Sequence, residues 1–237
     1  MSKKSNVTLS LVVPVLNEEE LIEDTIKIYT QDIKKLFTKF EIIIVDDGST
    51  DKTPQILAKL KNAGKIKLIT HTKNLGVGEA ITNGFAAAKM EWVMTNSADR
   101  PFDLLDLSKV LKDFSYADAI IFARFDRSAN PIFRKLTSTV SRLLVKTLFR
   151  VPISDFHFVQ IYKRLLLRKV KAQSRDTFMP AELLVKLSKK GYKITEHKAV
   201  FHGRTAGKSK YNNPIRYLRY LYELLKFWVR LNITKNV

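Results

Sequence analysis

The hydrophobic positions of the first 100 residues follow two alternating patterns. Short apolar runs rich in β-branched residues predict strands, and segments with apolar residues at three- and four-residue spacing predict helices. Strands are expected at residues 7–15, 41–45, 66–70 and 92–95, and a helix is expected after each of them. This alternation is typical of a mostly parallel sheet covered by helices, so the sequence predicts an α/β fold.

Each of these predicted strands ends in a polar segment. The segments lie at residues 16–20, 46–51, 73–78 and 96–99. In open parallel sheets, ligands bind beyond the carboxyl ends of the strands. We therefore expect the four segments to meet at one edge of the sheet and to form a binding site there.

Several residues in these segments also have a structural interpretation. Gly76 and Gly78 would let backbone N–H groups approach a phosphate, but turns also use glycine for backbone reasons. Asp46 and Asp47 could accept hydrogen bonds from a base or ribose, or one of them could cap the next helix. Strand alternation would point only one of the two aspartates into the crevice. Asn17 is expected as the N-cap of the first helix.

Composition narrows the chemistry and locates the charge. The 237 residues include no cysteine, which excludes disulfides, thiolate zinc sites and cysteine nucleophiles, and the four histidines show no metal-ligand spacing. The net charge is +19, of which residues 101–237 carry +18. Such a basic half fits nucleic acid, an acidic substrate or an anionic membrane, and no recognised nucleic-acid module is found. With no apolar run long enough to span a bilayer, a cytoplasmic protein is expected.

The order of the motifs resembles glycosyltransferase family 2, the inverting nucleotide-sugar transferases. The matching segments are residues 12–18, 44–51 (IVDDGSTD), 74–84 and 97–103. The resemblance implies the GT-A fold, a Rossmann-like three-layer sandwich. It also implies binding of a UDP- or GDP-linked sugar by Pro14, Asn17, Glu18, Asp46, Asp47, Asn74, Gly76 and Ala98.

The resemblance further implies a divalent metal at Asp99. That residue matches the last carboxylate of the family's Asp-x-Asp motif, but Ser97 stands at the first position. Mg²⁺ binds proteins through one or two carboxylates together with substrate phosphates and water, so Asp99 alone can hold Mg²⁺ or Mn²⁺ on a diphosphate. Asp103 is either a helper of Asp99 or a helix cap. A protein that has lost catalysis is the alternative.

The second half resembles the polyprenyl-phosphate sugar transferases, the group that includes dolichol-phosphate mannose synthase. The segments that carry the resemblance are residues 121–125, 151–155, 191–196 and 204–211, whereas Phe158 stands where a glycine is usual. A lipid phosphate is ionised near neutral pH and needs cations more than a base. We expect Arg124, Arg204, Ser209 and Lys210 to bind it. Asp155 is expected to orient an arginine, to act as a base, or only to hold its loop.

Two segments have the pattern of basic amphipathic helices. Apolar residues share one face of 133–148, and Ile215, Leu218, Tyr222, Leu225 and Val229 share one face of the C-terminal segment. Lysines and arginines flank both faces, and aromatics at 217, 220, 227 and 228 suit a membrane interface. The alternative is a pair of ordinary helices whose apolar faces pack on their own domain.

These patterns predict one glycosyltransferase domain and a membrane-surface helix. The domain is expected over residues 1–211, with a nucleotide-sugar half (1–100) and an acceptor half (101–211), followed by the helix at 212–237. The predicted function is transfer of a sugar to a polyprenyl phosphate by a peripheral protein on the cytoplasmic membrane face, with a membrane-protein partner as a further expectation. Another glycan, lipid or protein acceptor is the alternative. Glu182 is expected to face either the site or solvent.

Overall fold

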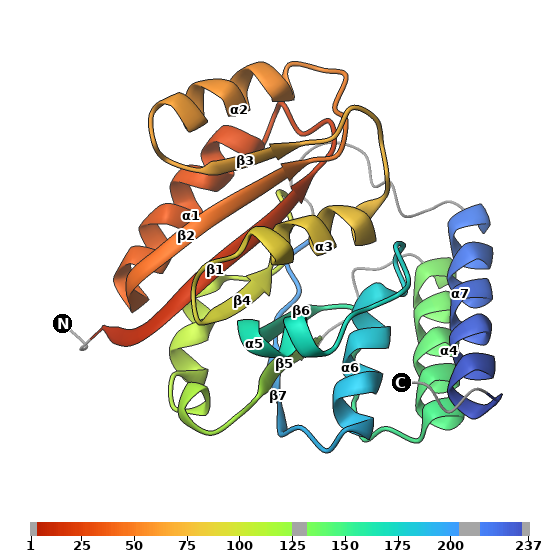
Figure 1. Ribbon diagram of the computed structural model, residues 1–237. Coiled ribbons are helices and arrows are strands. Elements are labelled where there is room, and N and C mark those ends of the chain that lie inside the picture. Colours follow the sequence, from red (N-terminus) through yellow and green to blue (C-terminus); the bar gives the residue numbers. More distant parts are fainter. Residues whose placement is uncertain (1–3, 125–131, 204–213, 234–237) are drawn as a thin grey trace.

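The computed structural model of the chain describes residues 4–124, 132–203 and 214–233 (Figure 1). Its centre is a seven-stranded sheet in the order β3-β2-β1-β4-β6-β5-β7. The strands are β1 (Ser5–Val15), β2 (Phe37–Asp46), β3 (Lys67–Thr70), β4 (Trp92–Thr95), β5 (Ala119–Arg124), β6 (Val159–Lys163) and β7 (Ile194–Ala199). Neighbouring strands are parallel except where β6 pairs with β4 and β5, which confirms the mostly parallel α/β sheet.

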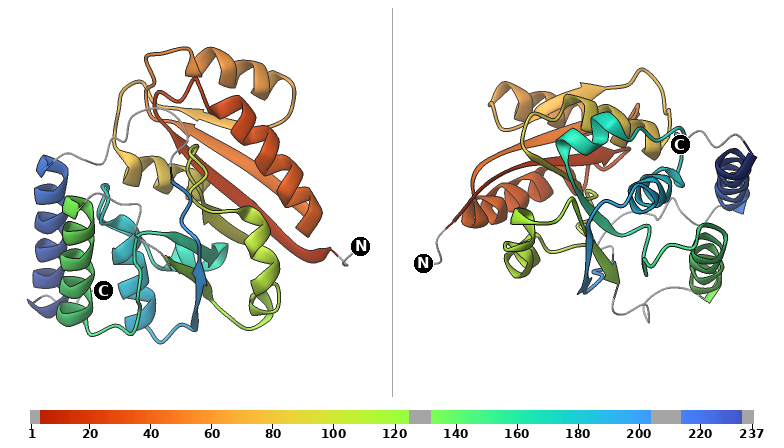
Figure 2. Two further views of the ribbon diagram at one scale, coloured as in Figure 1. Left: turned by 180° about the vertical axis from the view of Figure 1, so that it is seen from behind. Right: turned by 60° about the horizontal axis from the view of Figure 1, so that its bottom comes forward.

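Helices cover both faces of this sheet. They are α1 (Ile22–Leu36), α2 (Thr53–Asn62), α3 (Val77–Ala87), α4 (Ile132–Phe149), α5 (Arg164–Lys169), α6 (Met179–Lys189) and α7 (Pro214–Ile233), with the 3₁₀ helices η1 (Leu104–Val110) and η2 (Asp113–Ser115). The figures show α1 and α3 on opposite faces of the sheet (Figures 1 and 2). The result is the three-layer sandwich that the sequence predicts.

Alternate residues of β1 pack against the helices on the two faces of the sheet. Leu11 and Val13 of β1 are buried with α1, while Val12 is buried on the other face beside Ala80 of α3. A strand buried on both faces is a near-continuous apolar run, which is why residues 7–15 are easy to recognise in the sequence. On the α3 face, a Cβ at Gly84 would overlap Val12 Cγ1, so this glycine lets the helix approach the sheet closely.

The helices α4 and α7 lie side by side next to α6 (Figures 1 and 2). Tyr220, Leu224 and Phe227 of α7 are buried in one cluster with Phe149 of α4 and Phe178, which precedes α6. The C-terminal helix therefore packs on the same core as α6. None of the described helices has an apolar stretch long enough to cross a bilayer.

Some elements differ from the prediction. The helix expected at 104–114 forms two 3₁₀ helices instead. Helix α1 begins at Ile22 after Leu21, so Asn17 is not its N-cap. The sequence also missed β6, because this strand is only five residues long, contains Gln160 and Lys163, and follows a loop motif closely. The predicted boundary at residue 211 lies in the segment 204–213, outside the described residues.

Candidate functional site

The directions of the strands bring the four polar segments of the first half to one edge of the sheet. The strands β1, β2, β3 and β4 are parallel, and β5 and β7 point the same way because β6 is antiparallel to both β4 and β5. The carboxyl ends of six strands therefore meet the amino end of β6. The strand order reverses at β1, which has β2 on one side and β4 on the other. In α/β sheets such a switch point opens the crevice where ligands bind.

The first two motifs hold each other. The backbone N–H of Asn17 donates to Ser49 Oγ at 2.9 Å, and the Thr50 N–H donates to Asn17 Oδ1 at 2.8 Å. Asn17 has a φ of 50°, a left-handed conformation that asparagine tolerates better than most residues. One residue later, the Glu18 N–H donates to Thr53 Oγ1 at 2.9 Å. Asn17 therefore clamps the β1 loop to the β2 loop rather than capping a helix.

The two adjacent aspartates are both buried and both bind backbone. Asp46 accepts a hydrogen bond from the Ser49 N–H at 3.0 Å and closes its own turn. Asp47 reaches the next loop, where it accepts from the N–H groups of Leu75 at 2.8 Å and Gly76 at 2.9 Å. Strand alternation predicted that only one of the two would point into the crevice; in the structure each of them fixes a loop of the site.

A histidine that the sequence reasoning did not single out belongs to this network. His71 is buried directly after β3, and its Nδ1 lies 2.7 Å from Asp47 Oδ1. Its Nε2 lies 2.9 Å from the side-chain amide of Asn83 on α3. The signal that could have found it is its position, because His71 is the first polar residue after a strand whose neighbours end in functional motifs.

The glycines of the third motif serve packing. Gly76 has a φ of 100° and precedes α3, and a Cβ on Gly78 would lie 2.5 Å from the carbonyl carbon of Arg175. The Glu79 N–H donates to the Arg175 carbonyl at 3.1 Å, so that amide at the start of α3 already has an acceptor. This arrangement favours the structural interpretation of the Gly-x-Gly. Asn74 Oδ1 also accepts from the Gly76 N–H, at 3.0 Å.

The loop after β4 is held from beneath by α1. Tyr29 Oη donates to the Ser97 carbonyl at 2.6 Å, and Thr25 Oγ1 donates to the Ala98 carbonyl at 2.7 Å. The Ala98 side chain is buried, so a ligand would meet this residue through its backbone. Burial raises the pKa of Tyr29 well above its ordinary value, and the negative charge of Asp99 raises it further.

Asp99 differs from the other aspartates of this edge. Those at 46, 47, 51, 103 and 155 all accept hydrogen bonds from backbone N–H groups. The half-buried Asp99 carboxylate accepts none from a residue that the structure describes. Among the described residues, Asp99 is thus the aspartate of this edge whose carboxylate does not hold a loop, and it lies beside the switch point.

The candidate metal site contains a single carboxylate. Asp103 accepts from the Leu105 N–H at 2.9 Å and caps η1, so the cap interpretation of Asp103 is the correct one. The described residues contain no group of three or more potential metal ligands. One carboxylate fits an ion held mainly by a diphosphate and water, and it does not fit an ion held by protein alone.

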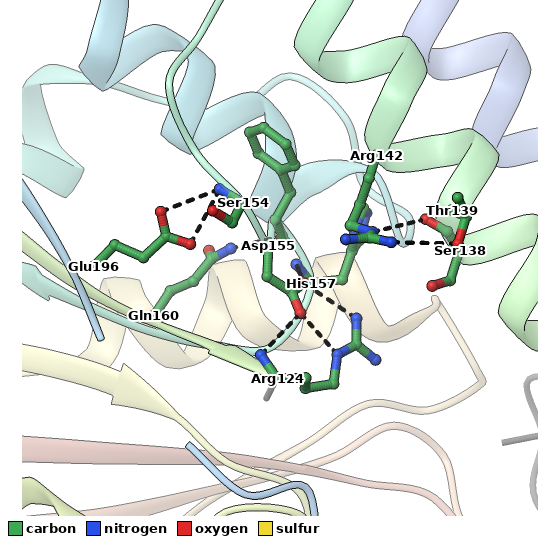
Figure 3. A network of polar contacts seen from close by, with 10 residues as sticks. Arg124, Ser138, Thr139, Arg142, Ser154, Asp155, His157, Gln160 and Glu196 are labelled. Carbon is green, nitrogen blue, oxygen red and sulfur yellow. Dashed lines mark hydrogen bonds and ion pairs between the residues drawn. The ribbon is translucent and has the colours of Figure 1, made fainter. Parts of the chain in front are cut away.

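At the far side of the edge, Arg124 and Asp155 form a buried ion pair. Arg124 Nε and Nη2 donate to the two carboxylate oxygens of Asp155 at 2.8 Å and 3.1 Å (Figure 3). The Asp155 side chain is fully buried and also accepts from the backbone N–H groups of Arg124 and His157. Of the three predicted roles, the geometry supports orienting the arginine, because a carboxylate with four donors is a poor base.

The remaining predicted residues have other positions. Arg204, Ser209 and Lys210 lie outside the described residues. Glu182 faces neither the site nor solvent, because it is buried and accepts from the N–H groups of Gln173 and Ser174 and from Lys186. Its role is to hold the loop before α6.

The apolar stripe predicted on α7 is exposed. Its members are Ile215, Leu218, Tyr222, Leu225 and Val229, which are between 43% and 65% exposed, together with Ile233 at 74%. The opposite face of the helix carries Tyr220 and Phe227, so the prediction that these two aromatics face a membrane is wrong. They pack inward because the helix is apolar on two faces rather than one.

Helix α4 also has both buried and exposed apolar residues. Val145 and Phe149 are buried against the core, and Leu144 and Leu148 pack beside them. Within the part of the predicted stripe whose side chains are described, Val140 and Leu143 are exposed. The single apolar face predicted for this helix is therefore partly packed against the core and partly exposed.

The comparison with known families agrees with this geometry. The model of "Glycosyl transferase family 2" matches residues 10–173. The chain belongs to this family. The match covers the donor motifs, Arg124 and Asp155, so the residues that meet at the sheet edge are those of a glycosyltransferase.

Relatives and solved structures are similar over most of the chain. An undecaprenyl-phosphate 4-deoxy-4-formamido-L-arabinose transferase from Pseudomonas fluorescens is 26% identical over 92% of this chain, which spans 63% of that relative's length. An uncharacterized glycosyltransferase from Mycobacterium tuberculosis is 25% identical over 93% of this chain and 96% of its own length. Glucosyl-3-phosphoglycerate synthase from M. tuberculosis, solved with Mn²⁺ and UDP, superposes with a TM-score of 0.73 at 18% identity, covering 93% of this chain and 80% of that one.

The buried pair yields a prediction about stability. Asp155→Asn removes one partner and leaves Arg124 buried without its counter-charge, which lowers the free energy of unfolding by about 3 kcal/mol or more. Asp106→Asn is the control, because Asp106 forms an exposed i,i+3 pair with Lys109 and its loss should change stability by less than about 1 kcal/mol. Urea unfolding measures both variants. Equal stabilities for the two would show that the buried pair does not hold this edge together.

Proposed function

We propose that this chain transfers a sugar, with inversion, from a UDP- or GDP-linked donor to a polyprenyl phosphate at the cytoplasmic face of a membrane. The observation that carries the proposal is the position of Asp99. This carboxylate lies beside the switch point of a family 2 fold and accepts no hydrogen bond from the residues that the structure describes. The acceptor class is supported by the relatives named as undecaprenyl-phosphate transferases.

The donor would lie across the ends of β1 to β4. The clamped loops of Asn17, Asp47 and Gly76 supply a fixed rim for the nucleoside, and Asp99 lies where a diphosphate would need charge neutralisation. Asp99 would hold a Mg²⁺ or Mn²⁺ ion together with the diphosphate oxygens, and that ion would stabilise the negative charge of the leaving group. Support for a metal comes from the structural neighbours solved with Mn²⁺ or Mg²⁺ and UDP.

The reaction itself is a single displacement. An oxygen of the acceptor phosphate forms the new bond to the anomeric carbon while the bond from that carbon to the nucleoside diphosphate breaks, and the configuration inverts. The acceptor phosphate is already ionised near pH 7, so the step requires no base. This is consistent with the commitment of Asp155 to Arg124 and two backbone N–H groups.

The acceptor phosphate would bind on the basic side of the edge. The Asp155 pair fixes the guanidinium of Arg124 at the end of β5, where its charge can face an anion. Arg204, Ser209 and Lys210 remain predicted partners of that phosphate, as the family resemblance implies. The two halves of the site would thus hold two anionic groups on either side of one sugar.

The exposed apolar stripe of α7 supports a location at a membrane surface. From Ile215 to Ile233 it extends about 27 Å along the helix. Exposed cations lie on α7 itself, for example Arg219, and on the neighbouring helix α4, for example Lys146. A stripe of this size beside basic side chains fits the interface of an anionic bilayer, where each lysine or arginine contributes about 1 kcal/mol.

A transfer assay tests the proposed reaction. The purified chain should move a sugar from one member of a panel of UDP- and GDP-sugars to undecaprenyl or dolichyl phosphate only when a divalent metal is present. Asp99→Asn should lower kcat/KM by about 100-fold or more, the scale expected when a group that stabilises the leaving charge is lost. Asp103→Asn should stay within about twofold, because asparagine also caps helices well.

Two results of this assay would contradict the proposal. Turnover that does not require the lipid phosphate would assign a different acceptor. Full activity of Asp99→Asn would remove the residue on which the proposal rests. If no donor in the panel is turned over while the chain still binds nucleotide, the protein is a binding protein that has lost catalysis.

A liposome experiment tests the membrane surface. Deletion of α7 is uninformative because it exposes the core cluster of Phe149 and Phe178. The double variant Leu218→Ser and Leu225→Ser changes only exposed positions. It should weaken binding to vesicles containing anionic lipid at least tenfold, since full burial of one leucine side chain contributes about 1.5–3 kcal/mol. Leu165→Ser with Val200→Ser removes two exposed apolar side chains elsewhere and serves as the control. Equal sedimentation of the two double variants would rule out this stripe as the membrane surface.

A further inference from the structure

We infer that His71 is a positioning residue for the nucleotide, because it fixes the carboxylate of Asp47 that binds the donor loop. This inference rests on the proposed nucleotide-sugar function and adds to it a residue that none of the sequence motifs contains. His71 follows β3 directly and is buried between the β2 loop and helix α3. Its role would be indirect, through another side chain.

Both ring nitrogens of His71 have a defined partner. Nδ1 lies 2.7 Å from Asp47 Oδ1, and Nε2 lies 2.9 Å from the Asn83 amide nitrogen. An amide nitrogen only donates, so Nε2 is the acceptor and Nδ1 carries the hydrogen that Asp47 accepts. The ring thus links a helix side chain to a carboxylate in a single chain of hydrogen bonds.

The hydrogen bonds of Asp47 show what this link controls. Oδ1 accepts from the His71 ring and from the Leu75 N–H, and Oδ2 accepts from the Gly76 N–H at 2.9 Å. A carboxylate has about four acceptor positions, and the donors among the described residues occupy three of them. Because Leu75 and Gly76 belong to the predicted donor loop, the orientation of Asp47 sets the position of that loop. An N–H group of a pyrimidine or purine base is a suitable fourth donor.

The backbone around His71 does not depend on its side chain. The His71 N–H donates to the Asp46 carbonyl at 2.9 Å and extends the pairing of β3 with β2. A change of the imidazole therefore removes the link to Asp47 while the strand remains paired. A second His–Asp pair in the chain, His197 with Asp113 at 2.6 Å, lies on β7 and η2 and gives a matched control.

Three substitutions separate positioning from packing. His71→Asn keeps a donor near the place of Nδ1, His71→Leu removes both links, and Asn83→Ala removes only the outer link. We expect His71→Leu to weaken the binding of UDP or GDP about tenfold, with His71→Asn within about threefold and Asn83→Ala between them. Binding is measured by titration calorimetry on the full chain. His197→Leu should leave nucleotide affinity unchanged, although it also removes a His–Asp pair.

A second measurement needs no nucleotide. If His71 positions the loop through Asp47, amide hydrogen exchange at Leu75 and Gly76 should be at least about tenfold faster in His71→Leu than in the unsubstituted chain. If His71→Leu does not fold, the same exchange is measured in the milder Asn83→Ala variant. Unchanged exchange and unchanged nucleotide affinity in a folded His71→Leu or Asn83→Ala variant would overturn the inference alone. Failure of the unsubstituted chain to bind any nucleotide would overturn the proposed function and this inference with it.

Discussion

Buried carboxylates at the carboxyl edge of the sheet are the constraint on which the rest of this structure depends. A parallel arrangement brings the ends of neighbouring strands together, and their polar loops must then satisfy one another away from water. Asp46, Asp47 and Asp155 do so by accepting hydrogen bonds from backbone N–H groups, and Asp155 also accepts them from an arginine side chain. Each of these bonds fixes one loop relative to its own strand or to the next, and this places backbone and side chains of the edge before any ligand binds.

The same constraint connects the N-terminal half of the molecule to its basic half. Glu182, buried beneath the loop before α6, accepts the N–H groups of Gln173 and Ser174. The next residue of that loop, Arg175, gives its carbonyl to the start of α3, beside the donor loop. Asp176 then pairs with Arg219 of α7 at 3.4 Å. The helix that carries the exposed apolar stripe is therefore in contact, through one loop, with the rim of the candidate nucleotide site.

Much of this architecture follows from local patterns in the sequence. The apolar runs that predicted β1, β2 and β4 are buried on both faces, and such runs are distinctive without tertiary information. The position of the motifs after each strand was enough to predict that they meet at one edge. The exposed stripe of α7 could also be identified, because Ile215, Leu218 and Tyr222 recur at helical spacing.

The features that were missed depend on partners distant in sequence. Asn17 looks like a helix cap until Thr50 is seen to use its side chain, and Glu182 looks exposed until the 173–174 loop folds over it. No local pattern distinguishes Tyr220 and Phe227, which pack inward, from the exposed row of the same helix. Asp99 could be singled out by motif, but its lack of a structural partner among the described residues appears only in three dimensions.

The central claim is that the edge formed by β1 to β4 is a nucleotide-sugar site in which Asp99 faces the diphosphate. A crystal structure of the chain with UDP or GDP and Mn²⁺ tests it most directly. The account predicts the diphosphate and the ion within coordination distance of Asp99 and the base beside the loops of Asp47 and Gly76. A nucleotide bound away from this edge, or an ion held without Asp99, would contradict it.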